Sequence, residues 1–224
     1  MKIIARIRSD FPSKFGIPRQ SGLVESLRST IVFEPGFRQP EALRGLEDYS
    51  HLWLIWEFSQ AKREEWSPTV RPPRLGGNER MGVFATRSPF RPNSLGLSSV
   101  RLLGMESTPR EGIVLHVAGA DLLDQTPIYD IKPYLAFTDS HPDAKGGFAD
   151  LSRDYGLDVH IPPALLQKVD PAKREALLGV LAHDPRPSYQ DDPERIYGMD
   201  FAGLEIRFQV EGKMLTVCEL KIEG

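Results

Sequence analysis

The sequence predicts a mainly β protein: an N-terminal single-sheet β-barrel followed by a small C-terminal α+β domain. Short strand-like segments follow one another without helices between them, which favours a barrel or sandwich over a doubly wound sheet. The chain of 224 residues contains 19 Pro and 19 Gly, numbers that are typical of a turn-rich protein. Near the C-terminus, clean alternation over 204–210 and a turn at 211–213 predict a β-hairpin with 214–222.

In the first part of the chain, apolar periodicity predicts seven strands. They are 3–7, 29–33, 52–58, 81–86, 97–103, 113–117 and 128–131. The nearly continuous apolar run 52–58 is interpreted as a strand buried on both faces. Residues 41–46 favour a short helix. The proline-rich stretch 67–93 is expected to be a functional loop, because long irregular loops in compact domains usually are.

A polar, turn-prone segment around 141–147 indicates a domain boundary. We therefore expect a barrel over 1–145 and a small domain over 146–224. In the second unit, 162–182 is interpreted as helical, with Asp170 as a helix N-cap and Pro171 at the first helical position. The single cysteine, Cys218, is interpreted as a core or strand residue and excludes an intramolecular disulfide.

The overall charge excludes a global attraction to nucleic acid, because the formal net charge is −3. Residues 71–101, however, contain six arginines and one acid, a local basic face suited to bidentate contacts. Solvated arginines scattered around the barrel are the alternative. The short, charged N-terminus does not resemble a signal peptide, and no apolar run reaches the roughly 18 residues of a membrane span. We therefore expect a cytoplasmic protein.

Several common catalytic motifs are absent from the sequence. No G-x-G-x-x-G motif follows a strand, and the chain contains no Walker A, H-E-x-x-H or G-x-S-x-G motif. The five histidines are far apart and lack metal-ligand spacing, so no metal site is expected.

Instead, several loops are dense in groups that bind polar ligands. The candidate segments are 15–22, 49–52, 74–78, 86–97 and 121–134. Arginines and backbone amides there can pair with phosphates or carboxylates, and the acids can bind hydroxyls or act as a base. The alternatives are an ordinary surface loop at 15–22, a core histidine at His51, and structural ion pairs at 121–134.

Five segments, in order, resemble motifs of the TrmO/TsaA-like family: 18–20, 49–53, 71–78, 82–93 and 124–134. Residues 184–189 resemble the start of the C-terminal portion of the bacterial members. The resemblance implies a non-Rossmann β-barrel methyltransferase that uses S-adenosyl-L-methionine. It also implies tRNA as substrate, at the N6 of threonylcarbamoyladenosine next to the anticodon, and a homodimer with the cofactor near the subunit interface.

Carried onto this sequence, the resemblance implies a set of cofactor-binding residues. They are Pro18, Arg19, Gln20, His51, Leu52, Arg87, Leu97, Asp121, Leu122, Leu123 and Asp124. For proton removal from the target nitrogen, we expect Asp124 as the base and Arg87 or Asn93 as stabilisers. Arg74, Asn78 and Arg91 are candidate substrate-binding residues. Two other functions remain open: an S-adenosylmethionine sensor, and a non-catalytic RNA-binding barrel.

Overall fold

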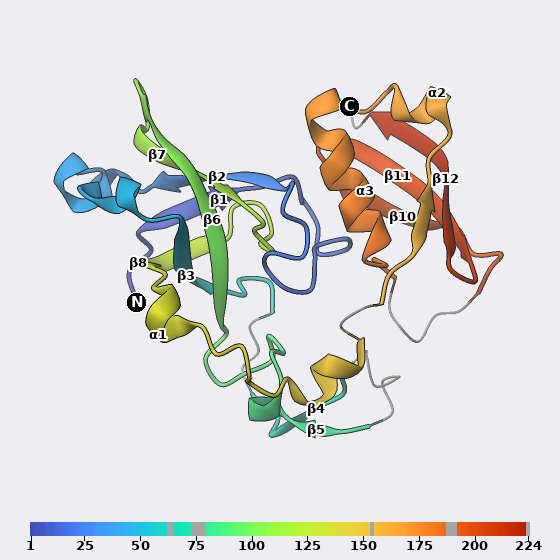
Figure 1. Ribbon diagram of the computed structural model, residues 1–224, viewed down its shortest axis with the longest axis horizontal. Helices are drawn as coiled ribbons and strands as arrows, with labels where there is room; N and C mark the ends of the chain where they lie inside the picture. The colour runs from blue at the N-terminus through green and yellow to red at the C-terminus, as the bar shows by residue number, and fades with distance from the viewer. Residues whose placement is uncertain (62–64, 73–78, 153–154, 187–191, 223–224) are drawn as a thin grey trace.

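The first part of the chain forms a closed barrel of six antiparallel strands (Figure 1). The computed structural model describes residues 1–61, 65–72, 79–152, 155–186 and 192–222. The barrel strands are β1 (Ala5–Arg8), β2 (Arg28–Phe33), β3 (His51–Glu57), β6 (Leu95–Thr108), β7 (Gly112–Ala118) and β8 (Pro127–Pro133). Their order is β1-β2-β7-β6-β3-β8, and pairing of Ala5 with Ile128 joins the last strand to the first. The expected mainly β class is confirmed.

Alternation along the strands fills the barrel with apolar side chains. The fully buried members include Ile7, Ile31, Leu52, Leu54, Leu115, Val117 and Ile128. Strand β3 alternates between buried and half-buried residues, so the expectation that it is buried on both faces is wrong. The short segment after β8 packs on its outer face: Trp53 donates a hydrogen bond to Asp139 (2.7 Å), the last residue of helix α1 (Ala136–Asp139).

The stretch between β3 and β6 contains a two-stranded ribbon, β4 (Thr69–Val70) and β5 (Met81–Gly82). The expected strand 81–86 therefore ends at Gly82, and a 3₁₀ helix, Val83–Ala85, follows. The short helix expected at 41–46 is also wrong. Gly45, in the left-handed region with φ of 86°, separates two 3₁₀ turns at Pro40–Leu43 and Leu46–Asp48, and a third lies at Pro35–Phe37.

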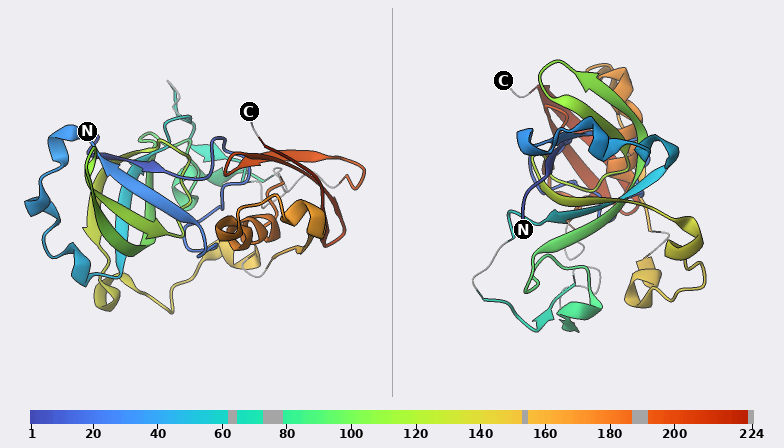
Figure 2. Two further views of the ribbon diagram at one scale, coloured as in Figure 1. Left: turned by 90° about the horizontal axis from the view of Figure 1, so that it is seen from above. Right: turned by 90° about the vertical axis from the view of Figure 1, so that its left-hand side faces the viewer.

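The second unit is a four-stranded sheet with helix α3 (Arg174–Ala182) packed on it, as Figure 2 shows. Its strands, in spatial order, are β10 (Tyr197–Phe201), β11 (Leu204–Glu211), β12 (Met214–Ile222) and β9 (Asp158–His160). The predicted hairpin of β11 and β12 is present. Strand β9, which pairs in parallel with β12, and strand β10 were not predicted. Cys218 lies in β12, which confirms its interpretation as a strand residue, but it is exposed and does not belong to the core.

The helix expected over 162–182 is interrupted. Helix α2 (Pro163–Leu166) and a 3₁₀ turn, Pro171–Lys173, precede α3. Because Pro171 disfavours helical backbone at Asp170, a continuous helix cannot pass this point. Asp170 does act as an N-cap: its carboxylate accepts a hydrogen bond from the Ala172 amide (2.9 Å).

The loop between β1 and β2 joins the two units. Phe11, Val24 and Leu27 from this loop are buried in the same core as α3 and the C-terminal sheet. Lys173 forms an ion pair with Asp10 (2.6 Å). The loop that contains the predicted residues Pro18, Arg19 and Gln20 is therefore fixed from both sides, whereas the boundary at 145/146 stays a prediction.

Within the described part of the chain, no helix is long and apolar enough to span a membrane. A short 3₁₀ helix, Gly147–Ser152, lies in the connection between the two units.

Gly96 permits close packing between β3 and β6. A Cβ atom at this position would lie 2.3 Å from the ring of Trp56, its cross-strand partner. We expect Gly96→Ala to lower the free energy of unfolding by roughly 1–3 kcal/mol, the usual cost of overpacking. Gly82→Ala is the matched control, because nothing lies within 4 Å of a Cβ there. Equal chemical denaturation midpoints for the two variants would contradict this explanation.

Candidate functional site

Two loops meet at one end of the barrel and bring predicted site residues together. The amide of Gly22 donates to the carbonyl of Gly119 (2.9 Å), and the amide of Gly119 donates to Leu27 (3.1 Å). Both glycines have positive φ, and a Cβ on Gly119 would lie 3.3 Å from the Gly22 backbone. Glycine is therefore required for the close approach that places the loop of Gln20 beside the loop of Asp121.

Asp121 is a half-buried carboxylate within a chain of hydrogen bonds. The Trp56 indole donates to the Ser98 hydroxyl (2.9 Å), which donates to Asp121 (2.6 Å). Burial raises the pKa of Asp121 above its ordinary value. The hydrogen bond from Ser98, the charge of Arg87 and the Ser21 backbone offset this effect only in part. A carboxylate with a raised pKa beside a cation suits proton transfer or recognition of polar ligand groups.

Arg87, which follows the 3₁₀ helix Val83–Ala85, connects the segment between β5 and β6 to the same place. Its guanidinium donates a hydrogen bond to the side-chain oxygen of Gln20. Because Arg87 also contributes to the electrostatic environment of Asp121, three separately predicted segments converge in one cluster. We call Gln20, Arg87, Ser98 and Asp121 the polar cluster. These four residues offer amide, guanidinium, hydroxyl and carboxylate groups to a ligand.

Arg19 lies next to this cluster and reaches the C-terminal unit. Its guanidinium donates to the carbonyl of Arg186 (3.4 Å). Asp184 holds Arg186 through two side-chain hydrogen bonds, at 2.9 and 3.0 Å, and both side chains are almost fully buried. Pro18, the remaining residue of the predicted segment, is buried. The C-terminal unit therefore supports the loop that carries Arg19.

Among the other predicted cofactor residues, His51, Leu52 and Leu97 also lie outside the polar cluster of this chain. His51 is at the opposite end of β3 from Trp56, roughly 16 Å away at about 3.3 Å per residue. Its ring packs against Tyr134. Leu52 is fully buried in the barrel core, and Leu97 faces outward with 58% of its surface exposed.

The side chains of residues 121–124 differ in burial and do not form one contiguous surface. Leu122 is buried in the core, and Leu123 is half-buried. Asp124 accepts a hydrogen bond from the Ser9 amide (3.0 Å), which anchors the end of β1. Its assignment as the base stays a prediction, but the structure places Asp121, not Asp124, beside Arg87.

The remaining predicted residues belong to the segment before β6. Arg91 donates to the carbonyls of Thr86 (2.6 Å) and Val83 (3.3 Å), so it holds this loop in shape. Asn93 is exposed, and its carbonyl accepts from the Leu95 amide (2.7 Å). Arg74 and Asn78 lie outside the described residues.

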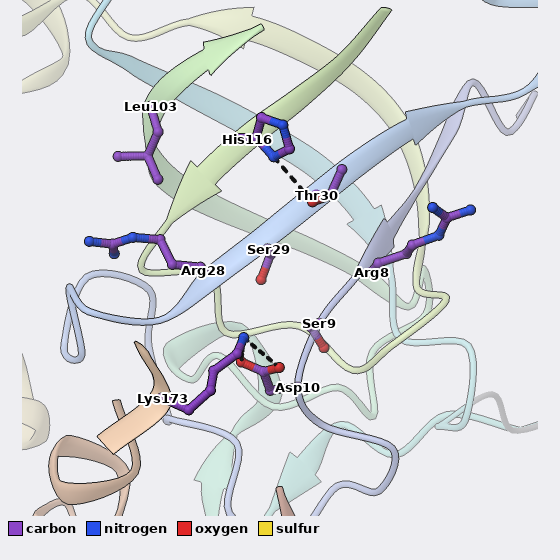
Figure 3. A pocket seen from close by; sticks show the side chains of 9 residues that line it. All are labelled: Arg8, Ser9, Asp10, Arg28, Ser29, Thr30, Leu103, His116 and Lys173. Carbon is purple, nitrogen blue, oxygen red and sulfur yellow. Dashed lines mark hydrogen bonds and ion pairs between the residues drawn. The ribbon is translucent and has the colours of Figure 1, made fainter. Parts of the chain in front are cut away.

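A hollow of about 460 Å³ lies elsewhere, between the barrel surface and the C-terminal unit (Figure 3). None of the predicted site residues lines it. Of its charged side chains, Lys173 pairs with Asp10 and Arg8 pairs with Glu111, and Arg28 donates to the backbone carbonyls of Glu25 and Leu27. We interpret it as the junction of the two units and not as the ligand site.

Comparison with known proteins shows the family. Residues 6–140 match the tRNA-methyltransferase O N-terminal domain, and residues 154–223 match the TrmO C-terminal domain. The chain belongs to the TrmO family. The family and class of enzyme predicted from the sequence are thereby confirmed.

Relatives of this TrmO-family chain are similar over most of its length. An Escherichia coli tRNA (adenine(37)-N6)-methyltransferase is 41% identical, with 92% of this chain and 91% of the relative covered. A Pseudomonas aeruginosa protein with the provisional name S-adenosylmethionine-dependent methyltransferase RcsF is 42% identical, covering 92% and 90%. A crystal structure of TrmO from Pseudomonas aeruginosa superposes with a TM-score of 0.77 at 36% identity, covering 97% and 96%.

The sequence did not reveal Trp56 and Ser98, the residues that support Asp121 in the polar cluster of this TrmO-family chain. Ser98 follows Gly96 and precedes Val100 on the buried face of β6, where apolar residues are expected. A polar side chain at an inward-facing strand position was therefore the signal. Its partner could not be read from the sequence, because Asp121 lies in a loop beyond the next strand.

Proposed function

We propose that this protein transfers a methyl group from S-adenosyl-L-methionine to the N6 of adenosine 37 in tRNA. We further propose that the accepted nucleoside is N6-threonylcarbamoyladenosine. The observation that carries the proposal is the polar cluster, in which Gln20, Arg87 and Asp121 converge from three loops. The names of the relatives support the tRNA position, and S-adenosylmethionine-dependent transfer appears in the name of one of them.

The groups of the polar cluster fit the chemistry of the donor. S-adenosyl-L-methionine supplies an electrophilic methyl group when bound, and it carries a carboxylate, an ammonium and ribose hydroxyls. Arg87 and Arg19 offer guanidinium groups to the carboxylate. Asp121 is a candidate acceptor for hydroxyl or ammonium protons, and the backbone of Arg19 and Gln20 provides amides for a purine edge.

The target nitrogen belongs to a urea-like group and is a poor nucleophile while it carries its proton. A base must remove that proton, or the site must stabilise the resulting anion. Asp121 is our candidate base, because burial raises its pKa toward the range in which a carboxylate accepts protons effectively. Arg87 would stabilise negative charge that develops beside it. Asp124, the base suggested by the sequence, is the competing assignment.

The homodimer and the cytoplasmic location remain proposals. A dimer would explain why His51 and the exposed Leu97 do not join the polar cluster within one chain. Residues of two chains could then complete one ligand site.

The proposed function is tested with methyl-labelled donor and two tRNA substrates, one with threonylcarbamoyladenosine at position 37 and one with plain adenosine. We expect label only in the first tRNA, at N6 of nucleoside 37. Equal labelling of both tRNAs would remove the threonylcarbamoyl requirement. Donor binding without transfer would support a sensor, and RNA binding indifferent to the donor would support a non-catalytic barrel.

A further inference from the structure

The β4–β5 ribbon exposes an unusual number of aromatic side chains. We use this name for residues 65–72 and 79–92, which contain β4, β5 and the 3₁₀ helix that follows. Three of the six exposed aromatic side chains in the described part of the chain lie here: Trp66 (49% exposed), Phe84 (72%) and Phe90 (36%). Figure 1 shows β4 and β5 projecting away from both the barrel and the C-terminal sheet, so these rings do not belong to either core.

The exposed rings are organised and not scattered. The rings of Trp66 and Phe84 lie 5.9 Å apart with an angle of 31° between their planes. Arg91 lies 5.9 Å from the centre of the Phe84 ring, and its hydrogen bonds to Val83 and Thr86 fix it there. Trp66, Phe90 and Arg91 also line a hollow of about 120 Å³. Flat rings held beside a guanidinium form a surface on which a nucleobase can stack.

The same ribbon is basic in a chain whose net charge is −3. Its described residues include Arg71, Arg80, Arg87 and Arg91 but only two acids, Glu65 and Glu79. Arg71 and Arg80 directly flank the paired residues Val70 and Met81, so they lie at the same end of the ribbon, and both are exposed. Aromatic rings interleaved with arginines are complementary to single-stranded nucleic acid, whose bases stack while its phosphates require cations.

The ribbon is continuous with the polar cluster. The ribbon lies between β3 and β6 in the chain. Trp56 is near the end of β3, and Ser98 is near the start of β6. Arg87, within the ribbon, bonds to Gln20 of the cluster. A nucleotide bound in the cluster would therefore have its neighbours along the strand close to the ribbon.

We propose that the β4–β5 ribbon is a stacking platform for the unpaired tRNA nucleotides that flank the target adenosine. Trp66 and Phe84 hold bases, and the exposed Arg71 and Arg80 hold phosphates. This inference rests on the proposed function and adds the surface by which the enzyme grips a single-stranded loop. A surface for a second copy of this chain would not need the excess of arginines, which would repel its own counterpart.

The test measures binding of an anticodon stem-loop RNA that contains threonylcarbamoyladenosine, at one fixed salt concentration. Trp66→Leu and Phe84→Leu keep apolar bulk but remove the ring. We expect each to weaken RNA binding roughly five- to a hundredfold, the range of one lost base–aromatic stack. Phe84→Tyr keeps the ring and should bind within about twofold of wild type, since stacking needs only a π-face. Binding of S-adenosyl-L-methionine by calorimetry should not change.

Two controls separate stacking from general surface effects. Phe137→Leu removes an exposed ring on α1, away from the ribbon, and should leave RNA binding unchanged. RNA should also quench the fluorescence of wild-type protein, and the quenching should decrease in Trp66→Leu. Because the substituted side chains are exposed, thermal unfolding should match wild type.

Unchanged RNA affinity in both leucine variants overturns the inference. A sedimentation mass of either leucine variant that differs from wild type also overturns it, because the ribbon would then be an interface between copies. The proposed function has a separate readout. If wild type methylates tRNA while the leucine variants bind RNA normally, only the stacking platform fails. If wild type transfers no methyl group to tRNA, the function itself fails.

Discussion

Asp121→Asn is expected to reduce the single-turnover rate of methyl transfer by roughly 10²- to 10⁴-fold, the usual contribution of a general base. Asparagine keeps the size of the side chain and can still accept the hydrogen bond from Ser98 (2.6 Å in wild type). It cannot accept a proton from the target nitrogen. Single-turnover measurement at saturating donor and tRNA isolates the chemical step from binding and product release.

Asp124→Asn is the matched control for this experiment. Its side chain accepts a hydrogen bond from the Ser9 amide, a role that an asparagine oxygen can also fill. We therefore expect a rate within a few-fold of wild type. A severe loss in Asp124→Asn together with a near-normal rate in Asp121→Asn would reverse the assignment and restore the base suggested by the sequence.

The pH profile gives an independent readout of the same carboxylate. A base must be deprotonated, so activity should fall as the pH decreases through its pKa. Burial raises the pKa of Asp121, so the acidic limb of kcat/KM should lie above the ordinary aspartate value of about 3.9. A limb at or below that value would remove Asp121 from the role of base. If Asp121 instead only binds the donor, Asp121→Asn would raise the donor KM and leave kcat nearly unchanged.

Much of the barrel could be predicted because its strands have locally readable patterns. The alternation in β1, β2 and β11 depends only on neighbouring residues and one buried face. Strand β9, with three residues, is too short for such a pattern, and its pairing with β12 joins segments far apart in the chain. The strand expected at 81–86 failed because apolar residues there also suit a 3₁₀ turn, which Val83 anchors in the interior.

The site was predicted in its segments but not in its geometry. The sequence suggested Gln20, Arg87 and Asp121 separately, and the structure brings them together through the Gly22–Gly119 contact. It also separates Asp121 from Asp124, which are three residues apart, because Leu122 between them enters the core. Side-chain direction in a loop depends on such tertiary packing, so no spacing rule could have distinguished the two acids.

Asp184→Asn is expected to lower the free energy of unfolding by roughly 3–5 kcal/mol, the typical cost of breaking a buried ion pair. Asp184 and Arg186 have side chains that are 7% and 6% exposed, and they share two hydrogen bonds. The Arg186 amide (3.2 Å) and the Tyr155 hydroxyl (2.8 Å) also donate to the Asp184 carboxylate. Removing the carboxylate charge leaves the Arg186 cation buried without its counter-ion, which is far more costly than losing an exposed pair.

Asparagine is the informative replacement at this position. Asp184 has a left-handed backbone with φ of 51°, which asparagine tolerates better than most residues, so the variant changes charge and not backbone strain. Glu205→Gln is the matched control, because Glu205 pairs with Arg207 on the surface, where their side chains are 33% and 43% exposed. We expect that control to cost less than about 1 kcal/mol. Chemical denaturation of Asp184→Asn and Glu205→Gln, fitted with a common m-value, would compare their losses of unfolding free energy.

The double variant Asp184→Asn/Arg186→Met separates the pair from its surroundings. Because replacing both members of a buried ion pair is often nearly neutral, the double variant should be more stable than Asp184→Asn alone.

The pH dependence of stability tests the same ion pair independently. Hydrogen bonds from Arg186 and Tyr155 outweigh burial and lower the pKa of Asp184, so its stabilisation is complete above about pH 4 and is lost as the pH falls through the lower folded-state value. Wild type should therefore lose stability more steeply than Asp184→Asn below about pH 4. Parallel acid curves, or a double variant less stable than Asp184→Asn, would show that the pair does not hold the loop that supports Arg19.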